Sequence, residues 1–447
     1  MGETGRRGDS KDHSLSAEIM EDEGPAQPQV PDAGGDMPFD IEAYSSNYTG
    51  HTKICRLKFI AERVAGTPME VEAFRMAVEE IKRVENVHMY NEIMERIGSK
   101  ISGLAYDGEW AAGVERKAAQ RQEKLEAELN GYKTNLIKES IRMGHNDLGD
   151  FHYERGDLQA AFKCYVRTRD YCTTSKHIVA MCLNIIKVSI ELKNFSHVSN
   201  YVQKAEQTPD VSDPVVLAKL RCAAGLAALE SRKYKQAARR FMETSFELGG
   251  HYSEVIAPQD VATYGGLCAL ASFERQELRS KVIDNIAFRN FLELVPEVRE
   301  LINDFYASRY ASCLGYLERL KPTLLLDMHL HTHVDTLYEQ IRSKALIQYT
   351  APFVSVDMNP MAEAFGTTVA GLEKEIAALI ISNQISARID SHNKILYARH
   401  ADQRSGTFQR ALGAGKEYQE GTRAMLLRAS LLQHDVIQRA GAGERER

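Results

Sequence analysis

The 447-residue sequence predicts a mostly α-helical fold, in which a tetratricopeptide-like helical-repeat solenoid is followed by a winged-helix subdomain and a long C-terminal helix. Three observations predict this fold. A local pattern returns at offsets of 37 and 39 residues through the middle of the chain, a helical pattern changes into an alternating one near residue 385, and apolar residues recur at heptad spacing after residue 408.

The repeated pattern is a turn between two helices, seen most clearly in the segments ERGDLQAA, ELKNFSHV and ESRKYKQA. A hairpin of two helices cannot cover its own apolar face, so a period near 34 to 40 residues predicts hairpins stacked in series. The drifting period leaves an irregular helical domain as the alternative. The apolar residues expected just after each turn are Leu158, Phe195, Tyr234, Leu278 and Tyr310.

Upstream of the repeats, spacings of four and three residues predict a long amphipathic helix that forms the first wall of the helical stack. Because the concave face of a solenoid is a general surface for peptides and proteins, this half favours binding over chemistry. The residues that define the apolar stripe of the helix are Leu125, Leu129, Tyr132 and Leu136.

Residues 367–397 predict a helix that runs into a β-hairpin, which is the arrangement of a winged helix. A helical apolar pattern from Val369 to Ile380 follows the capping candidate Thr367, and a four-residue corner at 391–394 separates two alternating stretches. Residues 361–400 hold equal numbers of acids and bases, and Glu373 and Glu375 would repel a phosphate backbone. We therefore expect a sheet edge that pairs with neighbouring protein subunits rather than with nucleic acid, through Ile385, Ile389, Ile395 and Tyr397.

The last helix carries a narrow apolar seam with spacings of three and four residues, which suits packing among other helices. The alternative is that it folds back on its own winged helix. The seam consists of Phe408, Ala411, Gly415, Tyr418, Thr422, Met425, Ala429, Leu432 and Val436. The residues expected at a subunit interface are Tyr418, Met425, Ala429, Leu432 and Val436.

Charge and composition divide the chain. The first 50 residues hold eleven acids and three bases, and residues 1–36 are expected to be a disordered acidic tail. Helical repeats are expected over 37–249 and a second domain over 250–405, with a helical part at 250–341 and the winged helix at 342–405. The C-terminal helix is expected at 406–440, followed by a disordered tail at 441–447. The absence of a signal peptide and an odd cysteine count without C-x-x-C predict an intracellular protein with free thiols.

The sequence predicts no enzyme, metal site or cofactor. His329, His331 and His333 in DMHLHTHVD are the strongest metal candidates, but helical periodicity begins at Val334 and would point alternate histidines apart, so we expect solvated imidazoles at a helix start. The RGD triplet, the NYT sequon and the GAGK segment all lack the context that their functions need.

Helical repeats followed by a winged helix with equal numbers of acidic and basic residues resemble the PCI-domain family. This family is shared by the proteasome lid, the COP-9 signalosome and a translation initiation factor. Residues 361–399 are similar to its most diagnostic stretch. The segments at 135–189, 223–247, 261–284, 342–365 and 402–432 resemble the signalosome branch, and the resemblance covers about residues 37–437. The proteasome-lid counterpart shares RSKVID and the winged helix but differs through KESIRMGH and the tail.

This resemblance implies a non-catalytic scaffold subunit of the signalosome, the complex that removes a ubiquitin-like modifier from the cullins of cullin-RING ubiquitin ligases. The implied partners are other subunits, of the PCI and zinc-isopeptidase types, and ligase components, but neither nucleic acid nor membrane. The implied location is the cytoplasm and nucleus, and the implied role of the C-terminal helix is a bundle with those of other subunits. The alternatives are a PCI subunit of the 26S proteasome regulatory lid, a nucleic-acid-binding winged-helix protein and, outside the family, a metal hydrolase.

Overall fold

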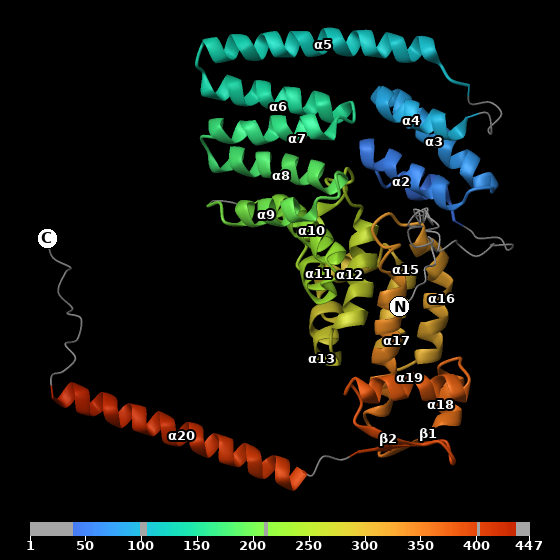
Figure 1. The fold of residues 1–447 in the computed structure, drawn as a ribbon, viewed down its shortest axis with the longest axis vertical. Coiled ribbons are helices and arrows are strands. Elements are labelled where there is room, and N and C mark those ends of the chain that lie inside the picture. The colour runs from blue at the N-terminus through green and yellow to red at the C-terminus, as the bar shows by residue number, and fades with distance from the viewer. Residues whose placement is uncertain (1–38, 99–104, 210–212, 400–402, 435–447) are drawn as a thin grey trace, which may run out of the picture.

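The structure, a computed structural model, describes residues 39–98, 105–209, 213–399 and 403–434. It confirms the predicted order of helical repeats, winged helix and C-terminal helix (Figure 1). The tails expected at 1–36 and 441–447 lie outside the described residues, as does Val436. Among the described residues, no helix combines the length and the apolar content that crossing a bilayer requires. All seven cysteines are free thiols, and five of them are buried.

The first four helices form a small core of their own, which includes Ile60, Tyr90 and the distant Leu326. Proline opens α3, and the Asn86 side chain accepts the Met89 N–H at the start of α4, so the sequence sets both boundaries locally. These helices are α1 (Ile41–Ser45), α2 (Gly50–Arg63), α3 (Pro68–Val84) and α4 (Val87–Ile97).

Helix α5 (Gly108–Thr134) lies across one end of the molecule (Figure 1). One end of α5 packs against α4, and Leu129 near the other end enters a core with Ile141 and Phe151 of the next helix. Leu125 and Tyr132 also contact this core, so most of the predicted apolar stripe is correct. Leu136 is the exception, because the helix ends before it and its side chain is 81% exposed.

The predicted repeats are stacked helical hairpins (Figure 1). Their close approach requires glycine, because a Cβ atom at Gly149 would lie 2.6 Å from the Tyr165 ring and one at Gly225 would lie 2.7 Å from the Phe241 ring. The elements are α6 (Lys138–Glu154), α7 (Leu158–Arg167), the 3₁₀ turn η1 (Thr168–Tyr171), α8 (Ser175–Glu191), α9 (Phe195–Glu206), α10 (Pro214–Glu230), α11 (Tyr234–Met242) and η2 (Phe246–Leu248).

The helices that follow share one continuous core with the repeats and with the winged helix. They are α12 (Pro258–Ser272), α13 (Arg275–Leu278), the π-helical turn η3 (Arg279–Ile283), α14 (Ile286–Leu292), α15 (Pro296–Tyr306), α16 (Tyr310–Leu325) and α17 (Val334–Thr350). Four of the five residues predicted after turns are the first residues of their helices, namely Leu158, Phe195, Tyr234 and Tyr310. The fifth prediction is wrong, because Leu278 ends α13 and the chain continues into η3.

The winged helix contains the predicted helix, hairpin and corner, and one strand that the sequence did not predict. The helix is capped by Thr368, one residue after the candidate Thr367. The elements are β1 (Ser355–Asp357), α18 (Met358–Ala364), α19 (Val369–Ile381), β2 (Ala387–Asp390) and β3 (Ile395–Ala398). The last helix, α20 (Gln403–Gln433), extends away from the winged helix (Figure 1).

A buried charge network fastens the N-terminal helices to the later ones. The Arg56 side chain on α2 is 1% exposed, and its guanidinium contacts Asp327 at 2.8 Å and Asp260 of α12 at 3.1 Å. Tyr44 and Tyr264 accept hydrogen bonds from the same guanidinium. Because these partners lie up to 271 residues away from Arg56 in the sequence, the network joins distant parts of the chain.

The segment between α16 and α17 corrects the expectation of solvated histidines. His329 and His333 are buried, and His333 lies within hydrogen-bonding distance of the Tyr234 hydroxyl at 3.2 Å. The helix does begin at Val334, as the periodicity predicts. No cluster of three or more metal-ligating side chains with metal-site geometry occurs among the described residues.

We expect His329 to make the protein less stable as the pH falls from about 6.5 towards 4. Burial, with the Arg56 charge beside it, lowers the pKa of His329 from 6.5 to about 4. Between these pH values the unfolded chain binds a proton that the folded chain does not. The free energy of unfolding therefore decreases as the pH falls, by at most about 3 kcal/mol from this group. In urea unfolding between pH 7.5 and pH 5, the free energy of unfolding should depend less steeply on pH for His329→Phe than for the wild type. Parallel pH profiles would contradict the assignment.

Candidate subunit interface

The three strands form an antiparallel sheet in the order β1-β3-β2, so β3 is central and the edges are β1 and β2. The sequence predicts a hairpin of two strands, in which each strand is an edge, whereas in the structure the third strand β1 covers β3. β1 was missed because it has three residues and pairs with a strand about 40 residues later. The edge available on the hairpin itself is therefore the outer side of β2.

The hydrogen-bond pattern shows which backbone groups face outward from β2. Arg399 donates its N–H to the Ser386 carbonyl at 2.9 Å, so this pair is a hydrogen-bonded one. Hydrogen-bonded pairs alternate along an antiparallel ladder, and Arg388 opposite Tyr397 is the next one. The N–H and C=O groups of Ala387 and Ile389 consequently point away from β3, towards any strand that pairs with this edge.

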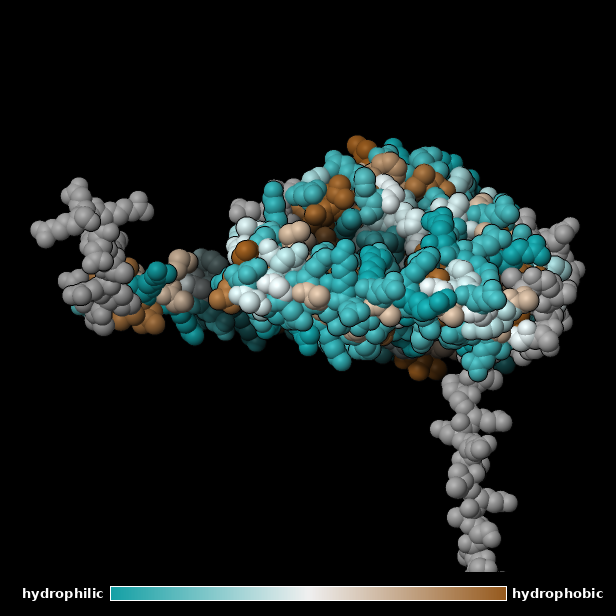
Figure 2. Space-filling model, turned by 90° about the horizontal axis from the view of Figure 1, so that it is seen from above, coloured by the Kyte–Doolittle hydropathy of each residue, from teal (hydrophilic) through white to brown (hydrophobic). Residues whose placement is uncertain are grey.

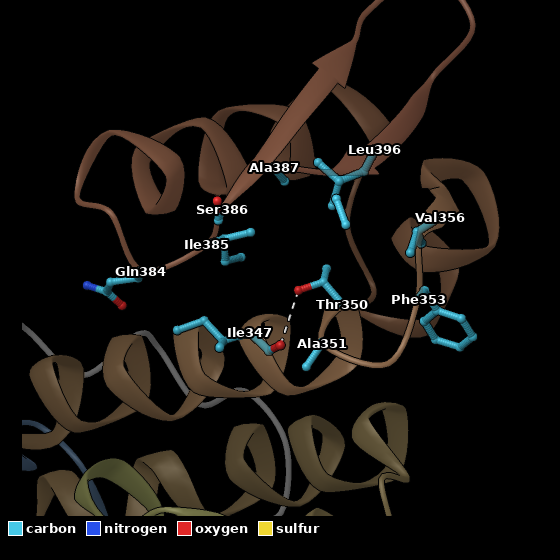
Figure 3. Close-up of a pocket in the computed structure, with 11 residues that line it drawn as sticks. Ile347, Thr350, Ala351, Phe353, Val356, Gln384, Ile385, Ser386, Ala387 and Leu396 are labelled. Atoms are coloured by element: carbon cyan, nitrogen blue, oxygen red, sulfur yellow. Dashed lines mark hydrogen bonds between the residues drawn. The ribbon is translucent and has the colours of Figure 1, made fainter. Parts of the chain in front are cut away.

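The structure does not bring the four predicted side chains together on one face. Ile389 lies opposite the buried Leu396 and Ile385 is buried beneath the sheet, so both belong to the core side. Figure 3 shows Ile385 and Leu396 beside a cavity of about 180 Å³ that reaches the end of α17. Ile395 and Tyr397 lie on the opposite face, where Tyr397 is 41% exposed.

An apolar hollow of about 350 Å³ lies beside the β2 edge. Ile380 and the exposed Ile381 at the end of α19 line it, together with Ala387. Arg388 and Arg399 border the hollow, and neither forms an ion pair within the described residues. The hollow and the outward backbone groups make the β2 edge a surface on which an extended segment with carboxylates could pair.

Ion pairs hold the helix and the hairpin in a fixed relation. Arg342 of α17 contacts Glu375 of α19 at 2.9 Å, and Lys394 in the hairpin corner contacts Glu373 at 3.0 Å. Hydrogen bonds from Ser391 and Lys394 hold the pKa of Glu373 below its usual value. The helix therefore keeps two charged carboxylates at the position where a nucleic-acid reader needs cations.

The second candidate interface is α20. Every described side chain of this helix is exposed or partly exposed, and the predicted seam residues Tyr418, Met425, Ala429 and Leu432 are all exposed. Figure 2 shows hydrophobic side chains on the helix where it projects beyond the body. Leu412 and Leu426 widen the seam on one side. Within the described residues the helix does not fold back on its own winged helix.

The helical repeats and the three-stranded winged helix define the class of PCI-domain proteins, and the family profile described as PCI domain matches residues 312–400. A profile described as 26S proteasome subunit RPN7 matches residues 107–281. A third profile, described as COP9 signalosome complex subunit 1, C-terminal helix, matches residues 403–430 and therefore most of α20.

Relatives match along nearly the whole chain. COP9 signalosome complex subunit 1 of Arabidopsis thaliana is 63% identical over 90% of this chain and 92% of its own length. Subunit 1b of Drosophila melanogaster is 43% identical over 89% and 86%, and subunit 1 of Emericella nidulans is 36% identical over 88% and 82%. The chain belongs to the COP9 signalosome complex subunit 1 family.

Proposed function

We propose that this chain is a non-catalytic scaffold subunit of the signalosome, which holds its neighbours through the β2 edge and through α20. The observation that carries the proposal is the apolar side of α20, which is exposed along the described helix and projects away from the body. An isolated helix gains little from such a surface, whereas a bundle of helices buries it. The match of the signalosome subunit 1 profile to this helix supports the same reading.

We further propose that the assembled complex removes a ubiquitin-like modifier from cullins of cullin-RING ligases, with the zinc isopeptidase in another subunit. The support is the family to which the chain belongs. Its partners are then the PCI and zinc-isopeptidase subunits and ligase components, in the cytoplasm and nucleus. The carboxylates on α19 argue against a nucleic-acid partner.

A proline at Ala387 should block assembly without unfolding the chain. The Ala387 N–H faces outward, so its loss leaves the internal ladder intact, while the ring obstructs a strand that pairs with the edge. We expect the isolated Ala387→Pro chain to keep a melting temperature close to that of the wild type. Its recovery with the other signalosome subunits in co-purification should fall at least tenfold.

Arg388→Pro is the matched control, because Arg388 forms the internal hydrogen-bonded pair with Tyr397. That variant should lower the melting temperature of the isolated chain, whatever happens in assembly. If Ala387→Pro enters the complex as well as the wild type does, the β2 edge is not a subunit interface.

A further inference from the structure

The turn between α5 and α6 exposes two large aliphatic side chains that the fold does not use. Leu136 is 81% exposed and Ile137 is 53% exposed, and neither belongs to a buried core. They stand next to each other at the corner of the helical stack. Residues 133–138, which join the two helices, form the α5–α6 corner.

Leu136 occupies a backbone position that favours polar residues elsewhere in the chain. Its φ angle is +55°, in the left-handed region that L side chains enter at a cost. The other non-glycine residues with positive φ in the described chain are all polar: Glu85, Lys193, Arg232, Ser308, Asn383 and Lys394. A leucine at this position therefore adds nothing that the turn needs and exposes apolar surface.

Ile137 occupies a second position where the fold favours a polar residue. It is the N-cap of α6 and provides no side-chain hydrogen bond. The five neighbouring α-helices all begin at a residue whose side chain accepts a backbone N–H: Asn86, Asp107, Asp157, Thr174 and Asn194. The corner gives up this stabilisation and presents an isoleucine instead.

Two cations stand on either side of the exposed pair. Lys133 and Lys138 are exposed, and neither forms an ion pair with a carboxylate in the part of the chain that the structure describes. The nearby carboxylate of Glu139 is already bound by Arg142 at 2.6 Å. The corner is thus a protruding apolar tip with uncompensated positive charge around it, which complements an apolar pocket bordered by carboxylates.

We infer that the α5–α6 corner is a docking tip for a protein that carries such an acidic-rimmed apolar pocket, and that this protein is a client of the assembly. This inference rests on the proposed function. Figure 1 places the corner at the opposite end of the molecule from the winged helix. Neighbours held through the β2 edge and α20 therefore leave the corner open to a protein that the complex acts on.

The test exchanges the corner for the arrangement that the chain uses at Lys193–Asn194, where a left-handed lysine precedes an asparagine N-cap. The double variant Leu136→Lys/Ile137→Asn is made in the full chain and assembled into the signalosome. We expect its isolated melting temperature to equal or exceed that of the wild type, and its co-assembly to be unchanged. Binding of the assembled complex to a purified, unmodified cullin-RING ligase should weaken at least tenfold.

Two further variants separate the contribution of the flanking lysines to ligase binding from that of exposed aliphatic surface in general. Lys133→Glu/Lys138→Glu should weaken ligase binding and flatten its dependence on salt concentration, because the flanking charges steer the encounter. Ile286→Asn removes an equally exposed aliphatic side chain on α14 and should leave ligase binding unchanged.

Several outcomes would overturn the inference. They are unchanged ligase affinity for the corner variant, a clear drop in its melting temperature, or self-association of the wild-type chain in light scattering that the variant abolishes. Failure of the wild-type chain to assemble with signalosome subunits would instead contradict the proposed function.

Discussion

Replacement of both Met425 and Leu432 by aspartate is expected to expel the chain from its complex while leaving the isolated chain folded. In the isolated chain Met425 is 69% exposed and Leu432 is also exposed, so new charges there remain solvated. The melting temperature should change by less than about 2 °C. In a helical bundle the same carboxylates would be buried without partners, at a cost of roughly several kcal/mol, which corresponds to a loss of retention of more than about 100-fold.

Leu427→Asp is the matched control for this experiment. Leu427 is 63% exposed on the same helix, but its heptad position faces away from the seam. Size-exclusion chromatography of the reconstituted complex should retain the Leu427 variant and lose the double variant. Equal loss of both variants would mean that charge on the helix matters rather than the seam, and retention of both would exclude α20 from the interface.

The largest effect on stability is expected at Arg56. Methionine at this position would leave the buried Asp260 and Asp327 facing each other without their shared cation. Burial raises the pKa of Asp260 and the Arg56 charge lowers it, so loss of Arg56 would make this buried carboxylate harder to ionise. Breaking a buried ion pair from one side costs about 3–5 kcal/mol, so the N-terminal helices should detach from α12. Limited proteolysis should then cleave the N-terminal helices of the variant faster than those of the wild type.

Two comparisons separate the contribution of the Arg56 ion pairs to stability from the contribution of side-chain packing. Arg96→Met removes a guanidinium that is about half exposed and pairs with Glu62 on the surface, and it should cost less than about 1 kcal/mol in urea unfolding. Adding Asp260→Asn and Asp327→Asn to Arg56→Met should recover part of the lost stability, because the buried charges disappear together. If the triple variant is no more stable than Arg56→Met, the network acts through shape rather than charge.

The helical fold was predictable because its signals are local. Tyr234 and Phe195 hold equal places in the repeat, and each begins a helix and packs into the shared core. Leu278 escaped the pattern because η3 lengthens the turn there. The Arg56 ion pairs could not be predicted from local sequence patterns, because Asp260 and Asp327 lie more than 200 residues away from Arg56.

The candidate interface was predictable in part. The heptad spacing identified the exposed seam of α20, but periodicity could not tell whether the chain itself covers it. In the winged helix, the alternating pattern correctly placed Ile395 and Tyr397 on one face of the sheet. Because β1 was not predicted from the sequence, the central position of β3 was not predicted either. The outward direction of the Ala387 N–H depends on register, which hydrophobic alternation alone does not fix for a four-residue strand.

Affinity purification of the tagged full-length chain from cells, with identification of the co-purifying chains, tests the scaffold assignment most directly. Signalosome and proteasome lid have disjoint membership, so a single experiment separates them. The proposed function predicts the remaining signalosome subunits, including the zinc isopeptidase, in equal stoichiometry with the wild-type chain and their loss with Met425→Asp/Leu432→Asp. Recovery of proteasome-lid subunits, or of the chain alone, would contradict it.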